Sequence, residues 1–323
     1  MKISAKKFER LEKLSDANGV IAALAIDQRG AIEKMLPSLE GEERTAFIKK
    51  YKAAVSEILT PYASSILLDP IYGLDAIGPK DADAGLLLAY EVTGYRDDKR
   101  QIDLLDGWSV RRLVEAGADA AKILLYYDVD DCPHNNDLKK ATVERIGAEC
   151  EAYDLPFFLE IITYDNKIGD TSSKEFAKVK PHKVNDAVAE FTKPQYKVDV
   201  LKLEIPVNMK YVEGFGDDPV YTQEEAKAYF KAQSEASTLP FIYLSAGVSA
   251  ELFQETLRFA KDGGCEFHGV LCGRATWKGG VDEYLKGEDK GIEWLNTEGK
   301  ANIQSLNEVI KETCTSWKTK LEK

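Results

Sequence analysis

The sequence predicts an α/β protein that folds as a single (β/α)8 TIM barrel over residues 1–323, with extra helices at the ends of the chain. Eight short apolar runs of strand length recur along it, and segments of helical periodicity separate them. At 323 residues the chain exceeds the roughly 250 that a typical barrel needs. Together these observations favour a closed barrel over an open parallel sheet.

The predicted strands are almost continuously apolar, which is typical of parallel strands that helices cover. A half-exposed antiparallel sheet would instead alternate apolar and polar residues. In chain order the predicted strands are Val20–Asp27, Ser64–Asp69, Gly85–Glu91, Ala120–Tyr127, Pro156–Tyr164, Val198–Val207, Pro240–Val248 and Glu266–Arg274.

Local signals mark several helices and loops between these strands. Thr222 and Glu225 form a predicted capping box, and Ser249 is placed to cap the helix that follows it. We expect Ala301–Lys323 to form a terminal amphipathic helix that lies on the barrel. Long segments rich in Gly, Asp and Lys are expected to be loops at the C-terminal ends of strands, where barrel active sites form: Tyr72–Ala84, Asp165–Pro181 and Tyr211–Tyr221.

Composition narrows the class of protein. The formal net charge of −12 argues against a nucleic-acid binder, and no apolar run is long enough to span a bilayer. We therefore expect a cytoplasmic enzyme with a small-molecule substrate, no membrane partner and no cofactor. Five scattered cysteines and three histidines argue against disulfides, structural zinc and a histidine-based metal site. A homo-oligomer is compatible with the sequence.

Three consecutive predicted strands each carry an ionisable residue within an apolar run, namely Lys122, Glu160 and Lys202. Neighbouring strands lie about 4.8 Å apart, so the three side chains can stand side by side if they face the same way. Burial lowers the pKa of a lysine, and a neutral lysine amine is a nucleophile for a carbonyl carbon. The pattern predicts a Schiff-base enzyme in which Lys202 is the nucleophile and Glu160 the general acid and base.

Two other interpretations of these residues remain open. A network of buried ion pairs without chemistry would also place charged residues inside strands. Glu204 shares the predicted face of Lys202 and is a second candidate for the acid and base role.

The ends of the last two predicted strands are suited to a phosphate. The run from Ser245 to Ser249 leads directly into a helix, and free backbone N–H groups at such a point bind anions. The predicted phosphate ligands are Ser245, Gly247, Ser249, Gly273 and Arg274. The alternative is that the serines only cap helices and the glycines only form turns.

Asp27, Gln28 and Arg29 end the first predicted strand and would project over the barrel mouth. They are candidates to bind sugar hydroxyls and a second phosphate, or else to form a salt bridge within the loop. Asp69 and Glu91 also end strands, and no role is assigned to them beyond hydrogen bonding in the lumen. His268 is expected to be a satisfied core histidine.

Long stretches of the chain resemble one known family. They include SSILLD (64–69), AKILLYYD (121–128), FFLEI (157–161), KLEIPVNMK (202–210), LSAGVS (244–249) and CGRA (272–275). In these stretches, and over nearly its whole length, the chain resembles the bacterial class I tagatose 1,6-bisphosphate aldolases. The segments Asp75–Ala84 and Arg96–Gly107 depart from the family pattern.

The resemblance implies a metal-free (β/α)8 lyase of lactose and galactose breakdown. It would cleave D-tagatose 1,6-bisphosphate to glycerone phosphate and D-glyceraldehyde 3-phosphate, and also accept the fructose epimer. It places the Schiff base on Lys202, the acid and base on Glu160 and the second active-site lysine on Lys122. Substrate contacts fall on Asp27, Gln28 and Arg29 and the phosphate site on the residues given above.

Two alternative functions are compatible with the same residues. One is an aldolase for another C6-substituted ketose 1-phosphate, such as sulfofructose 1-phosphate. The other is a sugar-phosphate sensor without turnover, whose sequence mark would be loss of Lys202 or Glu160; both residues are present.

Overall fold

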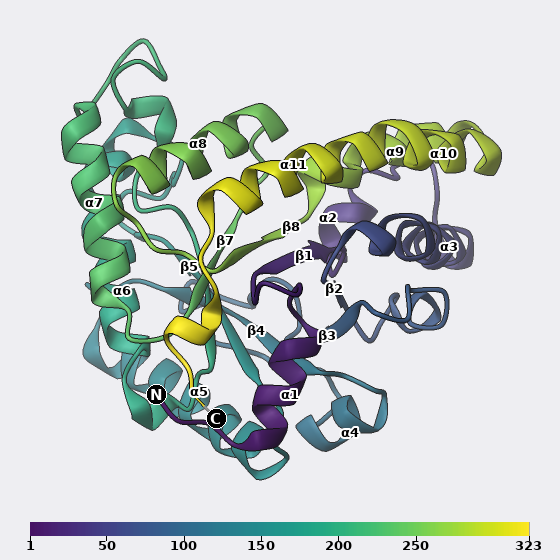
Figure 1. Cartoon of the computed structure of the whole chain (residues 1–323), viewed down its shortest axis with the longest axis horizontal. Coiled ribbons are helices and arrows are strands. Elements are labelled where there is room, and N and C mark those ends of the chain that lie inside the picture. The colour runs from purple at the N-terminus through teal and green to yellow at the C-terminus, as the bar shows by residue number, and fades with distance from the viewer. Residues whose placement is uncertain (323) are drawn as a thin grey trace.

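The computed structural model describes residues 1–322, and its centre is a closed barrel of eight parallel strands that neighbour one another in chain order (Figure 1). The predicted (β/α)8 fold is confirmed. The strands are β1 Ile21–Ala25, β2 Ser65–Leu68, β3 Gly85–Ala89, β4 Ala120–Tyr127, β5 Phe157–Thr163, β6 Val200–Leu203, β7 Phe241–Leu244 and β8 Gly269–Cys272.

Helices surround the barrel and bury one face against it (Figure 1). The α-helices are α1 Ala5–Lys13, α2 Gly30–Glu33, α3 Gly41–Leu59, α4 Val110–Glu115, α5 Pro133–Ala152, α6 Lys174–Phe191, α7 Gln223–Ala236, α8 Ala250–Asp262, α9 Arg274–Lys286, α10 Glu288–Trp294 and α11 Lys300–Thr313. Shorter turns are η1 Thr60–Tyr62, η2 Leu74–Ala76, η3 Pro194–Tyr196, η4 Met209–Tyr211, η5 Leu295–Gly299 and η6 Trp317–Thr319.

The connection from β2 to β3 differs from the other crossovers, because within this described stretch of the chain it holds only η2. The predicted loop Tyr72–Ala84 lies in this connection. The capping box of Thr222 and Glu225 is present at the start of α7, and Ser249 caps α8 by accepting a hydrogen bond from the Leu252 N–H. Both predicted caps are therefore confirmed.

Two predicted boundaries are wrong. The loop expected over Asp165–Pro181 ends at Ser173, whose side chain caps α6, and Pro181 lies inside that helix. Proline removes one backbone donor from a helix. Residues of α6 on both sides of Pro181 are nevertheless buried, and the helix continues through the proline. Tertiary packing of the helix against the barrel outweighs the helix-breaking tendency of a single proline.

The terminal helix expected over Ala301–Lys323 is also shorter than predicted, since α11 ends at Thr313. The chain then turns back so that Trp317 is fully buried, with its indole N–H donating to the Ser15 hydroxyl at 3.0 Å. Burying a tryptophan gains more than continuing an exposed helix would. Lys323 lies outside the described residues.

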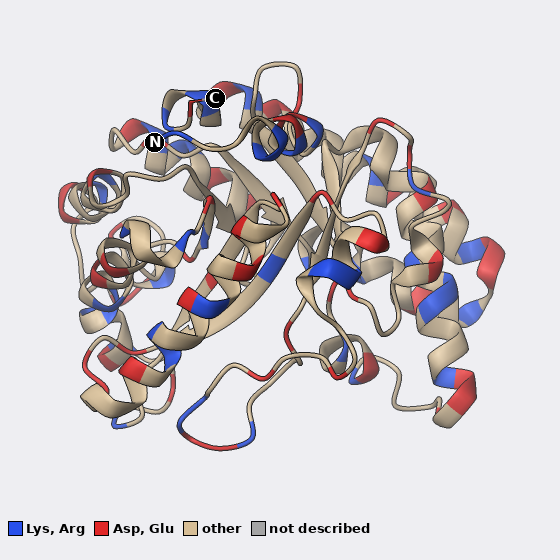
Figure 2. Cartoon of the chain, turned by 90° about the horizontal axis from the view of Figure 1, so that it is seen from below, with Lys and Arg blue, Asp and Glu red and all other residues tan. Residues whose placement is uncertain are grey.

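Acidic and basic side chains are mixed over the outer helices, and the two termini lie at the same end of the molecule (Figure 2). The Glu322 N–H donates to the Met1 carbonyl at 2.9 Å, which joins the two ends of the chain. Among residues 1–322, no helix is both long enough and apolar enough to cross a bilayer.

Candidate active site

The centre of the site is a pair of residues on neighbouring strands. Glu160 of β5 is in register with Lys202 of β6, and both side chains are buried. Oε1 of Glu160 lies 2.8 Å from Nζ of Lys202. The sequence suggested that these two side chains stand side by side, and the strand register brings them together.

Lys122 reaches the same carboxylate from β4, although it is not level with it. Lys122 is in register with Phe158, two residues before Glu160, so the three side chains meet although Lys122 starts lower in the barrel. The long lysine side chain spans the difference, and its Nζ lies 2.7 Å from Oε2 of Glu160. It also lies 3.0 Å from both Asp27 and Glu91.

These five residues form the mouth cluster, which we define as Asp27, Glu91, Lys122, Glu160 and Lys202. Within it the three carboxylates hold Lys122 as an ammonium. Burial alone would lower the pKa of Lys122, but Asp27, Glu160 and Glu91 raise it well above the ordinary value. Lys122 is therefore the cation of the cluster rather than its nucleophile.

The charge state of Glu160 follows from the same contacts. Burial favours the neutral acid, but Lys122 and Lys202 outweigh it and hold the pKa of Glu160 below its ordinary value. The pKa of Asp27 is likewise lowered, with Lys122 and Lys202 overcoming its burial. The cluster thus presents an ionised carboxylate to Lys202, which forms an ion pair with Glu160.

Arg29 does not project freely over the mouth. It is almost fully buried, its Nη1 donates to the Glu91 carbonyl at 2.7 Å, and its Nη2 lies 3.4 Å from the Glu91 carboxylate. Of the two sequence interpretations, the salt bridge to a neighbouring acid is the one observed. Burial raises the pKa of Glu91, although Lys122 and Arg29 act to lower it.

Several buried polar atoms beside the mouth have no hydrogen-bond partner among the described residues, and three of them lie on Gln28, Arg29 and Glu91. An unsatisfied buried polar atom is costly unless a ligand or water completes it. Gln28 also lies beside the end of β8, since a Cβ on Gly273 would be 3.1 Å from its Nε2.

The ends of β7 and β8, where the sequence predicts a phosphate site, lie side by side in the barrel. Ala246 and Gly247 have φ angles of 51° and 80°, so the chain turns sharply after β7. A Cβ on Gly247 would lie 2.9 Å from Nη2 of Arg274, which places the guanidinium directly against the glycine backbone. Ser245 is buried beside the Cys272 thiol. These groups surround a space suited to an oxyanion.

Ser249 and Gly273, the other two predicted phosphate ligands, have different surroundings. The hydroxyl of Ser249 caps α8, so it is already engaged, although the helix N-terminus it holds carries the positive end of the helix dipole. Gly273 precedes α9, and a side chain there would meet the backbone of β1. It keeps the close approach of β8 to β1 free of side-chain atoms.

Glu204, the second candidate for the acid and base role, lies outside the mouth cluster. Its carboxylate accepts hydrogen bonds from the Thr163 N–H at 2.7 Å and the Thr163 hydroxyl at 2.9 Å. Lys180 of α6 is 3.7 Å away. β6 ends at Leu203, so alternation of side chains no longer holds at the next residue.

Glu91 is the residue of the cluster whose role the sequence did not indicate. Its position after an apolar strand was visible, but Asp69 occupies the same kind of position and pairs instead with Lys52, beneath the mouth. Only the fold shows that Glu91 contacts Lys122 of the mouth cluster whereas Asp69 contacts Lys52. Among residues 1–322, no three His, Cys, Asp or Glu side chains are placed as ligands for a metal ion.

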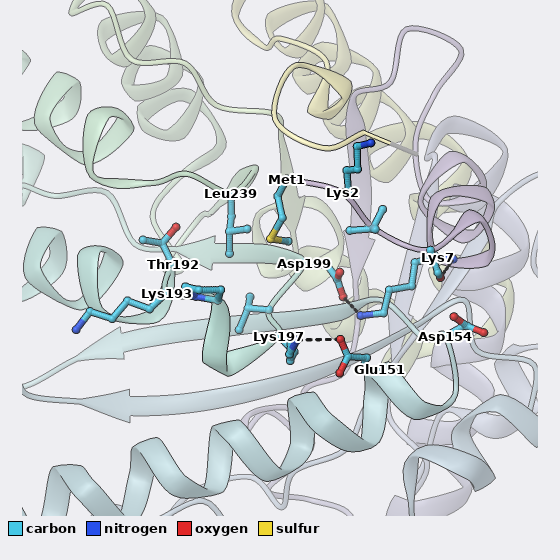
Figure 3. Close-up of a pocket in the computed structure, with 14 residues that line it drawn as sticks. Met1, Lys2, Lys7, Glu151, Asp154, Thr192, Lys193, Lys197, Asp199 and Leu239 are labelled. Carbon is cyan, nitrogen blue, oxygen red and sulfur yellow. Dashed lines mark hydrogen bonds and ion pairs between the residues drawn. The ribbon is translucent and has the colours of Figure 1, made fainter.

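A separate cavity of about 380 Å³ lies at the opposite end of the barrel, beside the chain termini (Figure 3). Its charges are paired with each other: the buried Lys7 lies 2.7 Å from Asp199, and the exposed Lys197 lies 3.0 Å from Glu151. Barrel active sites form at the C-terminal ends of the strands, where the mouth cluster lies. We therefore assign the candidate site to the mouth.

Comparisons with known proteins agree with this geometry. Residues 21–279 match the family model described as DeoC/LacD family aldolase. Tagatose 1,6-diphosphate aldolase 2 of Enterococcus faecalis is 58% identical over 324 residues, covering 99% of this chain and 98% of that protein. Tagatose 1,6-diphosphate aldolase of Streptococcus pneumoniae is 56% identical over 326 residues, covering 99% and 100%.

Solved structures with low sequence identity share the fold. The fructose-bisphosphate aldolase of Plasmodium falciparum has a TM-score of 0.66 at 17% identity, covering 95% of this chain and 96% of that one. An archaeal fructose-1,6-bisphosphate aldolase has a TM-score of 0.56 at 14% identity, covering 94% and 99%. The family match and the two close relatives, together with the barrel, establish that this chain belongs to the DeoC/LacD family of aldolases.

Proposed function

We propose that the protein is a class I aldolase that cleaves D-tagatose 1,6-bisphosphate to glycerone phosphate and D-glyceraldehyde 3-phosphate, with Lys202 as the Schiff-base lysine. The observation that carries the proposal is the Glu160 carboxylate between Lys202 and Lys122, at 2.8 and 2.7 Å. Close relatives named as tagatose 1,6-diphosphate aldolases support the substrate.

The first step is addition of the Lys202 amine to the C2 carbonyl of the open-chain ketose. Glu160 is ionised and in contact with Nζ, so it can take one proton from the Lys202 ammonium and free the amine that attacks C2. The resulting carbinolamine loses its hydroxyl as water, with a proton returned from the same carboxyl group. The product is an iminium ion, which is an electron sink for the next step.

Cleavage follows when Glu160, again a carboxylate, takes the proton from the C4 hydroxyl. The C3–C4 bond breaks, its electron pair moves into the iminium to give an enamine, and the C4 fragment leaves as an aldehyde. The enamine is then protonated at C3 by the Glu160 carboxyl group, and water hydrolyses the iminium to release glycerone phosphate and the Lys202 ammonium. Every proton transfer can use one carboxyl group held between two cations.

The remaining residues of the site would hold the substrate in place. The C1 phosphate would bind at Ser245, Gly247 and Arg274, next to the amine that attacks C2. Asp27 and Lys122 lie where the C3 and C4 hydroxyls would reach them. Because one carboxylate accepts the C4 proton, we expect the fructose epimer to be cleaved as well.

Parallel steady-state cleavage of D-tagatose and D-fructose 1,6-bisphosphates tests the function, and borohydride trapping tests the nucleophile. The unmodified protein should cleave both sugars, and borohydride with glycerone phosphate should leave a reduced adduct on the peptide that contains Lys202. Lys202→Ala should lose both cleavage and adduct, whereas Lys180→Ala, outside the lumen, should keep both. An adduct that persists in Lys202→Ala would overturn the assignment.

A further inference from the structure

A second cationic group lies at the barrel mouth outside the mouth cluster. The guanidinium of Arg100 lies over three tyrosine rings, with Cζ 3.9 Å from the ring centroid of Tyr164, 4.7 Å from that of Tyr95 and 5.9 Å from that of Tyr126. Contacts of this kind hold a guanidinium plane in a fixed orientation. We call these four residues the arginine box.

Two of the rings belong to the strands that carry the reacting residues. Tyr126 is four residues after Lys122 on β4, and Tyr164 is four residues after Glu160, just beyond β5. Side chains alternate along a strand, so Tyr126 shares the lumen face of Lys122, about 13 Å further towards the mouth. Tyr164 lies past the end of β5, and its hydroxyl contacts Lys139 and Asp131 beside α5. The arginine box therefore stands above the mouth cluster.

The loop that carries Arg100 is fixed at its base and along its length. Glu91 and Leu104 form an antiparallel bridge that closes the loop. The side-chain amide of Asn135 donates to the Lys99 carbonyl at 3.1 Å, and that of Asn166 donates to the Asp98 carbonyl at 3.2 Å. Figure 2 shows this loop at the end of the barrel away from the termini, with basic, acidic and basic residues in turn at its tip.

The guanidinium of Arg100 has no carboxylate within ion-pair distance in residues 1–322, and its Nε is buried without a hydrogen-bond partner. Arg29, in contrast, donates a hydrogen bond to the Glu91 carbonyl and forms an ion pair with its carboxylate. A further cation lies near: Lys139 is buried and donates to the Tyr164 hydroxyl at 2.7 Å. Burial and the nearby Arg100 lower the pKa of Lys139 to about 8, against the charge of Asp131.

The arginine box faces the C1 phosphate site across the mouth. In a closed ring of eight strands β4 stands opposite β8, and β5 stands opposite β1. A ligand with Arg274 at one end would thus extend over Lys202 and Glu160 towards Arg100 at the other. A guanidinium fixed by aromatic rings and lacking an acid is suited to a terminal phosphate, which it can bind with two parallel hydrogen bonds.

We propose that Arg100 binds the phosphate on C6 of the ketose and so selects bisphosphates over ketose 1-phosphates. This assignment rests on the proposed function. Arg29, which the sequence offered for a second phosphate, would then support Glu91 instead.

The test compares cleavage of D-fructose 1,6-bisphosphate with cleavage of D-fructose 1-phosphate in the unmodified protein, Arg100→Ala and Arg100→Lys. Loss of a charged hydrogen-bond pair should lower kcat/KM for the bisphosphate by roughly ten- to a hundred-fold in Arg100→Ala, mainly through KM. Cleavage of the 1-phosphate and trapping of glycerone phosphate should be unchanged, because neither uses the C6 phosphate. Arg100→Lys should fall between the two, since it keeps the charge without the planar pair of donors.

The matched control is Arg96→Ala, which removes a largely exposed arginine of the same loop that pairs with Asp103 at 2.6 Å; its substrate ratio should be unchanged. Equal losses on both sugars in Arg100→Ala, or no loss on the bisphosphate, would overturn the assignment of Arg100. An unmodified protein that neither cleaves nor traps would instead overturn the proposed function, and this assignment with it.

Discussion

Glu160 and Lys202 occupy paired positions on β5 and β6, and the carboxylate oxygen Oε1 lies 2.8 Å from the lysine Nζ. The second oxygen of the same carboxylate lies 2.7 Å from Lys122. A single ionised base is thus in contact with the proposed nucleophile and with a permanent cation. Five predictions follow from this arrangement and from the packing that supports it.

Glu160→Gln should lower kcat for bisphosphate cleavage by roughly a hundred- to ten-thousand-fold, the usual contribution of a positioned acid or base. The amide cannot accept the C4 proton, although Lys202 remains in place. Steady-state kinetics measure the loss, and Glu204→Gln is the matched control because Glu204 is bonded to Thr163 outside the cluster. A Glu160→Gln enzyme that retains more than a tenth of its kcat would contradict the role.

Lys122→Met should move the acidic limb of the kcat profile to higher pH. Lys122 is one of the two cations that hold the pKa of Glu160 below its ordinary value despite burial. Its removal raises the pKa of Glu160, so the carboxylate is protonated and inactive over a wider acid range. Rates between pH 4 and 8 measure the shift, and Lys122→Arg should preserve the original limb. An unmoved limb in Lys122→Met would exclude this electrostatic role.

Gly247→Ala should raise the KM of every ketose 1-phosphate by about ten-fold, the cost of roughly one charged hydrogen bond. The new Cβ would meet the Arg274 guanidinium at 2.9 Å, and φ is 80° at this position, which strains any L side chain. Gly78→Ala is the control, because its Cβ would meet no atom within 4 Å. Equal KM values for the two variants would argue that the phosphate binds elsewhere.

Lys52→Met should destabilise the fold by about 3–5 kcal/mol, because it leaves the Asp69 carboxylate buried without its cation. Both side chains are fully buried, and Lys52 also donates to the Gln28 carbonyl at 2.9 Å. Urea unfolding measures the change. Lys52→Met combined with Asp69→Asn should recover part of the loss, since the amide oxygen can still accept from the Ile71 and Tyr72 N–H groups. A double variant no more stable than Lys52→Met would show that the buried charge is not the cause.

His268 should make the fold less stable as the pH falls from 6.5 towards 4. Burial lowers the pKa of His268 from 6.5 to about 4, against its hydrogen bond to Phe241. The unfolded chain therefore binds a proton at pH values where the folded chain does not, and the free energy of unfolding falls by on the order of 3 kcal/mol across this window. Urea titrations at several pH values measure it, with exposed His134→Gln as control. A His268→Gln protein with an unchanged pH dependence would contradict the assignment.

The sequence alone determined the order and type of the elements that matter. Eight apolar runs predicted eight parallel strands, because side-chain burial on both faces leaves a pattern that can be identified along the chain. It also placed Lys122, Glu160 and Lys202 inside those strands, where a charge is costly and therefore conspicuous. Whether the last two share a face stays open in the sequence, because that depends on the register between strands.

Only the tertiary structure decided which partners these residues meet. Lys122 sits two residues below Glu160 because barrel closure sets the strand register. Arg29 pairs with Glu91 across 62 residues of sequence, and Arg100 meets the rings of Tyr126 and Tyr164 only after its loop folds over the mouth. Local patterns report burial and periodicity, whereas long-range pairing depends on the shear of the closed sheet and the paths of loops, which no local pattern encodes.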